Sequence, residues 1–159
     1  MTKELMNTVN GIVLQVLYRG FRVLYERDSR VRAEVDGWED GRMLKLVCGP
    51  GGPVLVLQKK EGEGIVKLQR VQHADITMRF KTVKGAFQVL TGQKGVADAY
   101  ASHMFFLEGD IYKTMSFVRC VDYIEAYLFP KIMSERILKE VPDKQLSSLQ
   151  VYALALLGK

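Results

Sequence analysis

Hydrophobic and polar positions alternate in a helical pattern over residues 3–27. Polar residues recur there every three or four positions, and apolar residues fill the remaining arc. The polar stripe consists of Glu4, Thr8, Gly11, Gln15, Arg19, Arg22 and Glu26, and the apolar arc of Leu5, Val9, Ile12, Val13, Val16, Leu17, Val23 and Leu24. The pattern predicts one long amphipathic helix with Thr2 as its N-cap, ended by the charged stretch 27–34. Its wide apolar face favours packing on a sheet or another helix over lying in a membrane interface, because the polar face is not strongly cationic.

After residue 42 the pattern changes to short apolar runs. Turn-rich breaks at 49–53 and 61–64 divide the runs at 43–47, 54–57 and 65–71. This arrangement predicts two successive hairpins.

Two further strands are expected later in the chain. In residues 74–80, Ile76, Met78 and Phe80 alternate with polar residues, which predicts a strand with one wet and one buried face. Residues 103–108 predict a fifth strand, stopped by Gly109 and Asp110.

Helices are predicted between and after these strands. Residues 83–90 form a short helix closed by Gly92, and residues 96–102 a second one that presents Ala97, Tyr100 and Ala101 inward. Residues 111–129 form a longer helix with Asp110 as N-cap. Its expected buried stripe is Ile111, Met115, Val118, Val121, Ile124 and Leu128. A last helix begins at Pro142, with Leu146, Leu149, Ala153 and Leu156 at core spacing, so the whole chain is predicted to be one α+β domain.

Composition supports a core without cross-links. The chain has 159 residues, 48% of them hydrophobic, and a chain of this length can bury about 70% of its unfolded surface without a metal or disulfide. Cys48 and Cys120 lie far apart in apolar surroundings, which indicates reduced, buried thiols in a cytoplasmic protein, with a single long-range disulfide as the alternative. The run 12–18 makes a poor signal peptide because Gln15 interrupts it. No stretch reaches the roughly 18 apolar residues of a spanning helix.

The net charge is +5, a basic balance that mildly favours anionic partners such as an acidic membrane surface. Acidic residues dilute the densest basic stretch, at 19–32, and no aromatic residues interleave with it, so nucleic acid is not an expected partner. A solvated helix face with its exit loop is the favoured interpretation of that stretch.

Catalytic equipment is scarce. Neither His73 nor His103 has metal-ligand spacing, and no nucleophile elbow is present. The glycine-rich segment 49–52 lacks the lysine of a phosphate loop and precedes a strand. We therefore expect no enzyme activity, catalytic residue, metal or cofactor.

Soft apolar side chains are instead plentiful between residues 78 and 118. For any one of them, a place in the core is the favoured interpretation. Their methionines and aromatic rings would also suit an adaptable pocket for a lipid.

Four local sequences follow one another in this region: DITMRF at 75–80, FQVLTG at 87–92, VADAYA at 96–101 and FFLEGD at 105–110. Their order and spacing resemble the sterol carrier protein 2 (SCP2-like) lipid-binding family. With the upstream hairpins, the resemblance covers about residues 35–125.

The resemblance implies a five-stranded, mainly antiparallel sheet covered by helices, with an apolar cavity between the two layers. It implies an SCP2-like domain over residues 1–159, with helical extensions at 1–34 and 126–159 around the core. The function implied is non-enzymatic binding or transfer of a fatty acyl chain, sterol or other lipid. Transient contact with an anionic membrane surface and a homodimer are further expectations. The expected ligand-binding residues are Met78, Phe80, Phe87, Leu90, Ala97, Ala101, Phe105, Leu107, Ile111, Met115 and Val118.

The sequence departs from the family pattern in two places. His103 stands where the family often has glycine, and residues 123–159 extend past the usual domain. This tail could cap the sheet, plug the cavity or form an oligomer contact. The alternative function is therefore a self-associating structural or regulatory module with a filled cavity and no ligand.

Overall fold

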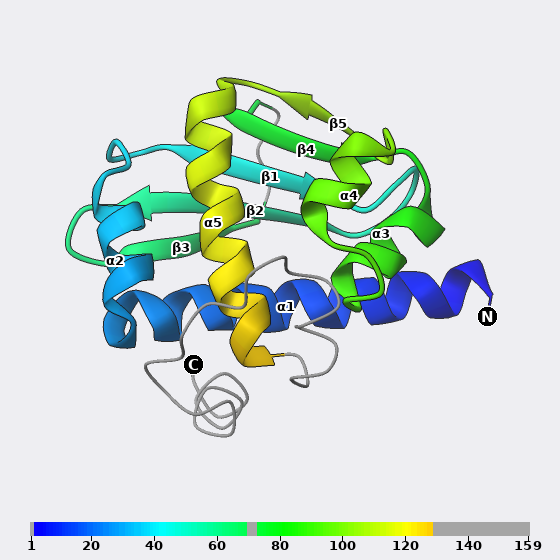
Figure 1. Ribbon diagram of the computed structural model, residues 1–159, viewed down its shortest axis with the longest axis horizontal. Helices are drawn as coiled ribbons and strands as arrows, with labels where there is room; N and C mark the ends of the chain where they lie inside the picture. Colours follow the sequence, from blue (N-terminus) through cyan, green and yellow to red (C-terminus); the bar gives the residue numbers. More distant parts are fainter. Residues whose placement is uncertain (1, 70–72, 129–159) are drawn as a thin grey trace.

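A computed structural model describes residues 2–69 and 73–128 of the chain (Figure 1). The elements in chain order are α1 (Lys3–Arg27), α2 (Ser29–Asp36), β1 (Met43–Val47), β2 (Val54–Lys60), β3 (Gly64–Leu68), β4 (Ile76–Phe80), α3 (Val83–Leu90), α4 (Val96–Ala101), β5 (Phe105–Glu108) and α5 (Ile111–Leu128). The C-terminal helix predicted from Pro142 lies outside the described residues.

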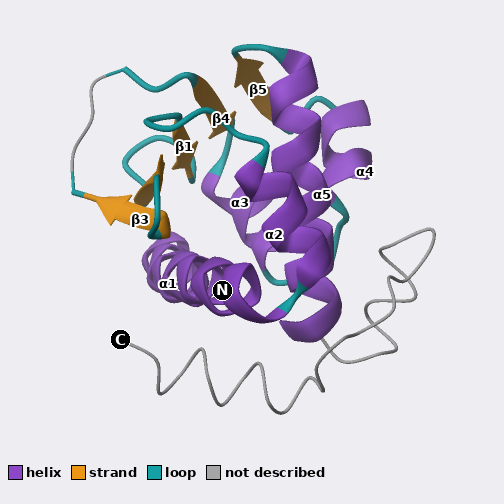
Figure 2. Cartoon of the chain, turned by 90° about the vertical axis from the view of Figure 1, so that its left-hand side faces the viewer, coloured by secondary structure: helices purple, strands orange, loops and turns teal. Residues whose placement is uncertain are grey.

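The five strands form one sheet in the order β3-β2-β1-β4-β5. Both predicted hairpins are confirmed, because β1 pairs antiparallel with β2 and β2 with β3. The central pair β1 and β4 is parallel, whereas β4 and β5 are antiparallel. The helices gather on one side of the sheet (Figure 2), and α5 crosses it between α2 and α4 (Figure 1). The mainly antiparallel α+β architecture is as predicted.

Helix α1 has the predicted bounds, and the Thr2 side chain caps it by accepting a hydrogen bond from the Leu5 amide. The buried face differs from the predicted apolar arc, because Leu5 and Ile12 are exposed and Asn10 is fully buried. The side of α1 that faces α3 is decided by tertiary packing: the Asn10 amide donates to the Val83 carbonyl at the start of α3. At the N-terminal end of α1, the periodicity therefore predicted the wrong buried face.

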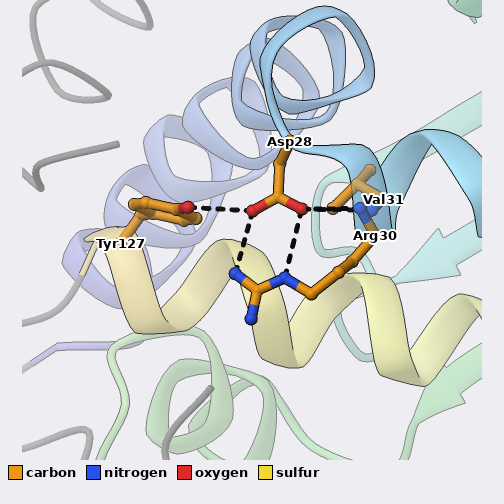
Figure 3. A network of polar contacts seen from close by, with 4 residues as sticks. All are labelled: Asp28, Arg30, Val31 and Tyr127. Carbon is orange, nitrogen blue, oxygen red and sulfur yellow. Dashed lines mark hydrogen bonds and ion pairs between the residues drawn. The ribbon is translucent and has the colours of Figure 1, made fainter. Parts of the chain in front are cut away.

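The charged stretch after α1 is a second helix, which corrects the prediction of an exit loop. Asp28 ends α1 and caps α2 by accepting hydrogen bonds from the amides of Arg30 and Val31 (Figure 3). Val31 and Val35, four residues apart, are fully buried on one face of α2. The sequence pattern did not reveal this short amphipathic helix, because its two buried valines lie between charged residues.

Two details of the β4–β5 region qualify the predictions. Thr77 was expected on a wet face, but it is buried. His103, which stands where the family often has glycine, has a φ of 56°, in the left-handed region that favours glycine.

Both cysteines are free and buried, as predicted, with no disulfide between them. Burial raises the pKa of the Cys48 thiol to about 12 and raises that of Cys120 as well. Neither thiol is a ready nucleophile, because the thiolate is the reactive form.

Glu125 is a buried carboxyl on α5, and its Oε2 has no hydrogen-bond partner among the described residues. Burial, reinforced by the charge of Asp122, raises its pKa to about 8, and burial raises the pKa of Asp122 to about 6. The folded state therefore holds these protons more tightly than the unfolded chain does. Stability from this source is complete at low pH and is lost as pH rises through the folded pKa values.

We expect Glu125→Gln to flatten this decline. Between pH values of about 6 and 8, its free energy of unfolding should fall by about 1–2 kcal/mol less than that of the original chain. Urea unfolding at a series of pH values measures the difference. Glu108→Gln, on an exposed side chain at the end of β5, is the control and should keep the original slope. Identical slopes for the original chain and Glu125→Gln would contradict the prediction.

Candidate functional site

An apolar pocket of about 170 Å³ lies between the β4–β5 edge of the sheet and the helices α4 and α5. Its floor is formed by Met78 of β4 and by Phe105 and Leu107 of β5. Met78 and Leu107 are direct partners in the antiparallel ladder, so their side chains stand together on the same face. This is the face that the helices cover.

Aromatic contacts hold the β5 end of the floor in place. The rings of Phe80 and Phe105, also ladder partners, meet edge to face with centroids 5.4 Å apart. The Tyr100 ring of α4 lies 5.7 Å from that of Phe105. Phe105 is therefore fixed from the strand beside it and from the helix above it.

The two helices form the walls. Helix α4 contributes Val96, Ala97 and Tyr100. Helix α5 contributes Ile111, Thr114, Met115 and Val118, whose spacing of three and four residues places them on one helical face. The Thr114 hydroxyl donates to the Asp110 carbonyl, so this wall offers no unpaired hydroxyl.

The mouth of the pocket opens to solvent through three of these residues. Tyr100, Ile111 and Met115 are 49%, 57% and 47% exposed, although all three line the pocket. Ile111 and Met115 were expected to be buried along α5, but among the side chains of that stripe whose burial the structure describes, only Val121 and Ile124 are buried. The apolar pattern of α5 thus continues past the core and onto the pocket wall.

Seven of the eleven predicted binding residues line this pocket: Met78, Ala97, Phe105, Leu107, Ile111, Met115 and Val118. The other four do not. Phe80 and Leu90 belong to the core, Phe87 is half-buried, and Ala101 is exposed rather than turned inward. Helix α3, which carries Phe87 and Leu90, packs against α1, and neither of these side chains lines the pocket.

Val96, Tyr100 and Thr114 also line the pocket but were not among the predicted binding residues. Val96 and Tyr100 lie four positions apart on α4, and this spacing was a usable signal. Thr114 carried none, because a threonine between apolar helix positions is not distinguished by sequence.

The pocket volume limits what it can enclose. A dry cavity of about 150 Å³ lined by apolar side chains holds one benzene molecule. The pocket therefore accommodates about six carbon atoms in its present shape, whereas drug-sized ligands occupy pockets of about 300–1,000 Å³.

Metal-binding geometry is absent from the described part of the chain, where no three His, Cys, Asp or Glu side chains converge. In residues 2–69 and 73–128, no helix combines the length and apolar character needed to cross a membrane.

No family model matches the chain. No curated protein matches it in sequence either. The chain is similar in structure to the apo form of Sterol Carrier Protein 2 from Yarrowia lipolytica, with a TM-score of 0.50 and 12% identity over 72% of this chain and 90% of that one. This likeness shows that the chain has the SCP2-like fold.

Two other structures are similar at lower TM-scores. A UbiJ-SCP2 ubiquinone synthesis protein has a TM-score of 0.45 and 18% identity over 76% of this chain and 96% of that one. A conserved hypothetical protein from Thermus thermophilus, described as a candidate sterol carrier protein, has a TM-score of 0.47 and 17% identity. That match covers 79% of this chain and 87% of the other.

Proposed function

We propose that the chain binds a hydrophobic ligand through an alkyl or acyl segment inserted between β4, β5, α4 and α5. The observation that carries the proposal is the apolar pocket itself, because its walls bury no unpaired polar group and its mouth is open. The SCP2-like fold agrees with lipid binding or transport in general terms.

Burial of hydrocarbon is the driving force. At about 0.8 kcal/mol per CH₂, about six enclosed carbons contribute about 5 kcal/mol before the cost of immobilising the ligand. This favours one acyl chain over a sterol, whose ring system exceeds the volume of the pocket. The part of the acyl chain that does not fit in the pocket would lie against the exposed side chains of Tyr100, Ile111 and Met115 at the mouth.

The proposed role needs no covalent step, so we propose a non-enzymatic carrier or binding protein. A cytoplasmic location is part of the proposal and rests on the two free, buried cysteines. If the apolar mouth contacts a membrane, a lipid can pass between the membrane and the pocket without crossing water.

A fluorescent fatty acid titrated into the lipid-stripped, full-length chain tests the proposal. We expect saturable binding and displacement by unlabelled fatty acids. Affinity should rise steeply up to about six carbons, by about fourfold per CH₂, and more slowly beyond, because further carbons lie outside the pocket. The proposal is wrong if the probe does not bind and native mass spectrometry of the purified chain detects no lipid.

The alternative, a self-associating module, is favoured by the same exposed side chains at the mouth, which a second copy could cover. Sedimentation at several concentrations separates the two functions. A stable dimer that excludes the probe supports self-association, and a monomer that binds the probe supports the carrier.

A further inference from the structure

A second concave site lies on the opposite side of α5 from the apolar pocket. It is a groove of about 500 Å³ between α2 and the first turns of α5, and Trp38 and Arg42 from the segment between α2 and β1 also line it. Figure 1 shows α5 with α2 on one side and α4, which borders the apolar pocket, on the other. The groove is of the size of small-ligand sites, and most of the residues that line it are charged or polar.

One wall of the groove is a row of side chains linked by hydrogen bonds. The Trp38 indole N–H donates to the Ser116 hydroxyl at 2.7 Å, and that hydroxyl donates to Glu34. Arg119 donates to both oxygens of Glu34, at 2.7 and 3.1 Å. These bonds outweigh burial and hold the pKa of Glu34 below its ordinary value, with the Arg119 hydrogen bond as the largest cause. The Glu34 carboxylate is therefore occupied, and its charge is balanced by Arg119.

The second carboxylate of the groove is tied to the start of α5 through one of its oxygens. Asp110 caps α5 by accepting hydrogen bonds from the amides of Tyr112 and Lys113, at 2.8 and 3.2 Å. This places it against the positive end of the helix, which offsets its charge. Among the described residues, neither Asp110 nor Glu34 forms an ion pair with the two remaining cations of the groove.

Those cations are Arg42 and Lys113. Arg42 is only 7% exposed, and its Nε–H is buried with no acceptor among the described residues. Its guanidinium lies 5.8 Å from the centre of the Trp38 ring, a contact that orients it without neutralising it. Among the described residues Lys113 pairs only with Glu39, whose side chain is 72% exposed, so solvent screens this pair and a ligand can replace it.

We propose that this groove binds an organic oxyanion, a carboxylate or phosphate, whose charged end is held by Arg42 and Lys113. A buried guanidinium whose Nε–H has no acceptor among the described residues is costly, and an oxyanion in the groove would supply its missing counter-charge and accept hydrogen bonds from its accessible edge. Tyr112, which is 87% exposed, supplies aromatic surface for the organic part of the ligand, and the buried Trp38 borders the same space. The site does not depend on the apolar pocket, so it can stand if the lipid proposal fails.

The groove contains its own reporter, because Trp38 is the only tryptophan in the chain. Titration of the full-length chain with phenyl phosphate and with benzoate, followed by tryptophan fluorescence, should give a saturable change. Benzyl alcohol, which has the ring without the charge, should give none. Raised salt should weaken binding, because it screens the cations.

Three variants locate the site. Arg42→Gln should weaken phenyl phosphate binding by about tenfold or more and Lys113→Gln by about threefold, whereas Lys67→Gln should leave it unchanged. Lys67 is a matched control because it is an exposed lysine on β3 and does not line the groove. If Arg42→Gln does not fold, Arg42→Lys is the alternative variant. It keeps the positive charge but lacks the planar pair of donors of the guanidinium, so it should weaken binding while the fold is retained.

Vesicles separate the two sources of oxyanion. Co-sedimentation with phosphatidic acid vesicles but not with phosphatidylcholine vesicles, lost in Arg42→Gln, identifies a lipid headgroup. Binding of phenyl phosphate without vesicle binding identifies a free small molecule. The proposal is overturned if none of the oxyanions or acidic vesicles binds, or if the Arg42 and Lys113 variants bind as tightly as Lys67→Gln.

Discussion

Replacement of Ala97 by tryptophan should weaken binding of the acyl probe by about 100-fold or more, because the indole occupies the space of the approximately six ligand carbons. Ala97 lines the pocket yet is exposed, so a larger side chain can enter the space without displacing the core. The cost to the fold is limited to the lower helix propensity of tryptophan, about 0.5 kcal/mol. Probe titration measures the loss, and circular dichroism checks the fold.

Ala33→Trp is the matched control. Ala33 is also an exposed alanine on a helix, but it lies on α2 and borders the polar groove on the other side of α5. We expect it to leave probe affinity unchanged. Equal binding by Ala97→Trp and the original chain would show that the probe does not use this pocket. An equal loss in both variants would assign the effect to a general change in the fold.

Replacement of Asp28 by alanine should lower the free energy of unfolding by about 3 kcal/mol. Asp28 is almost fully buried where α1 meets α2. Its carboxylate accepts from the Arg30 guanidinium at 3.0 and 3.3 Å, from the Arg30 amide at 2.9 Å and from the Tyr127 hydroxyl at 2.8 Å (Figure 3). The substitution removes the cap of α2, leaves the Arg30 charge without this partner, and cuts the link from α2 to the end of α5.

Two further variants separate the cap from the charge. Asp28→Asn keeps a capping side chain and should cost about 1 kcal/mol. Asp36→Ala removes an exposed carboxylate at the other end of the same helix, where its contact with Tyr25 is exposed, and should change stability by less than about 0.5 kcal/mol. Urea unfolding provides the measurement. A loss in Asp28→Ala no larger than that in Asp36→Ala would contradict the role of the network.

The pH dependence gives an independent check on Asp28. Burial raises the pKa of this carboxyl, but the hydrogen bonds from Arg30 and Tyr127 outweigh it and hold the pKa below its ordinary value of 3.8. The resulting stability is present above that ordinary value and is lost as pH falls through the folded pKa. The difference in stability between the original chain and Asp28→Asn should therefore shrink in acid.

Much of the fold was accessible from sequence because its signals are local. Thr2 and Asp110 cap their helices as predicted, and the bounds of α1, α3 and the two hairpins follow from periodicity and turn residues. Helix α2 was missed because its two buried valines lie within a run of charges. The division into a core and helical extensions stays a prediction, and its C-terminal part lies largely outside the described residues.

By itself, the sequence determined that the chain is an α+β protein with an excess of apolar side chains between residues 78 and 118. It did not determine which of them form the core and which line the pocket, because the same residue types occur in both places. In the tertiary structure α3 packs on α1 and its Phe87 and Leu90 do not line the pocket, whereas α4 and α5 both border the pocket and α4 adds Val96 and Tyr100 to it. It also brought Arg42 to the groove beside α5, where no described residue accepts a hydrogen bond from its buried Nε–H, and no local sequence pattern encodes this relation between distant segments.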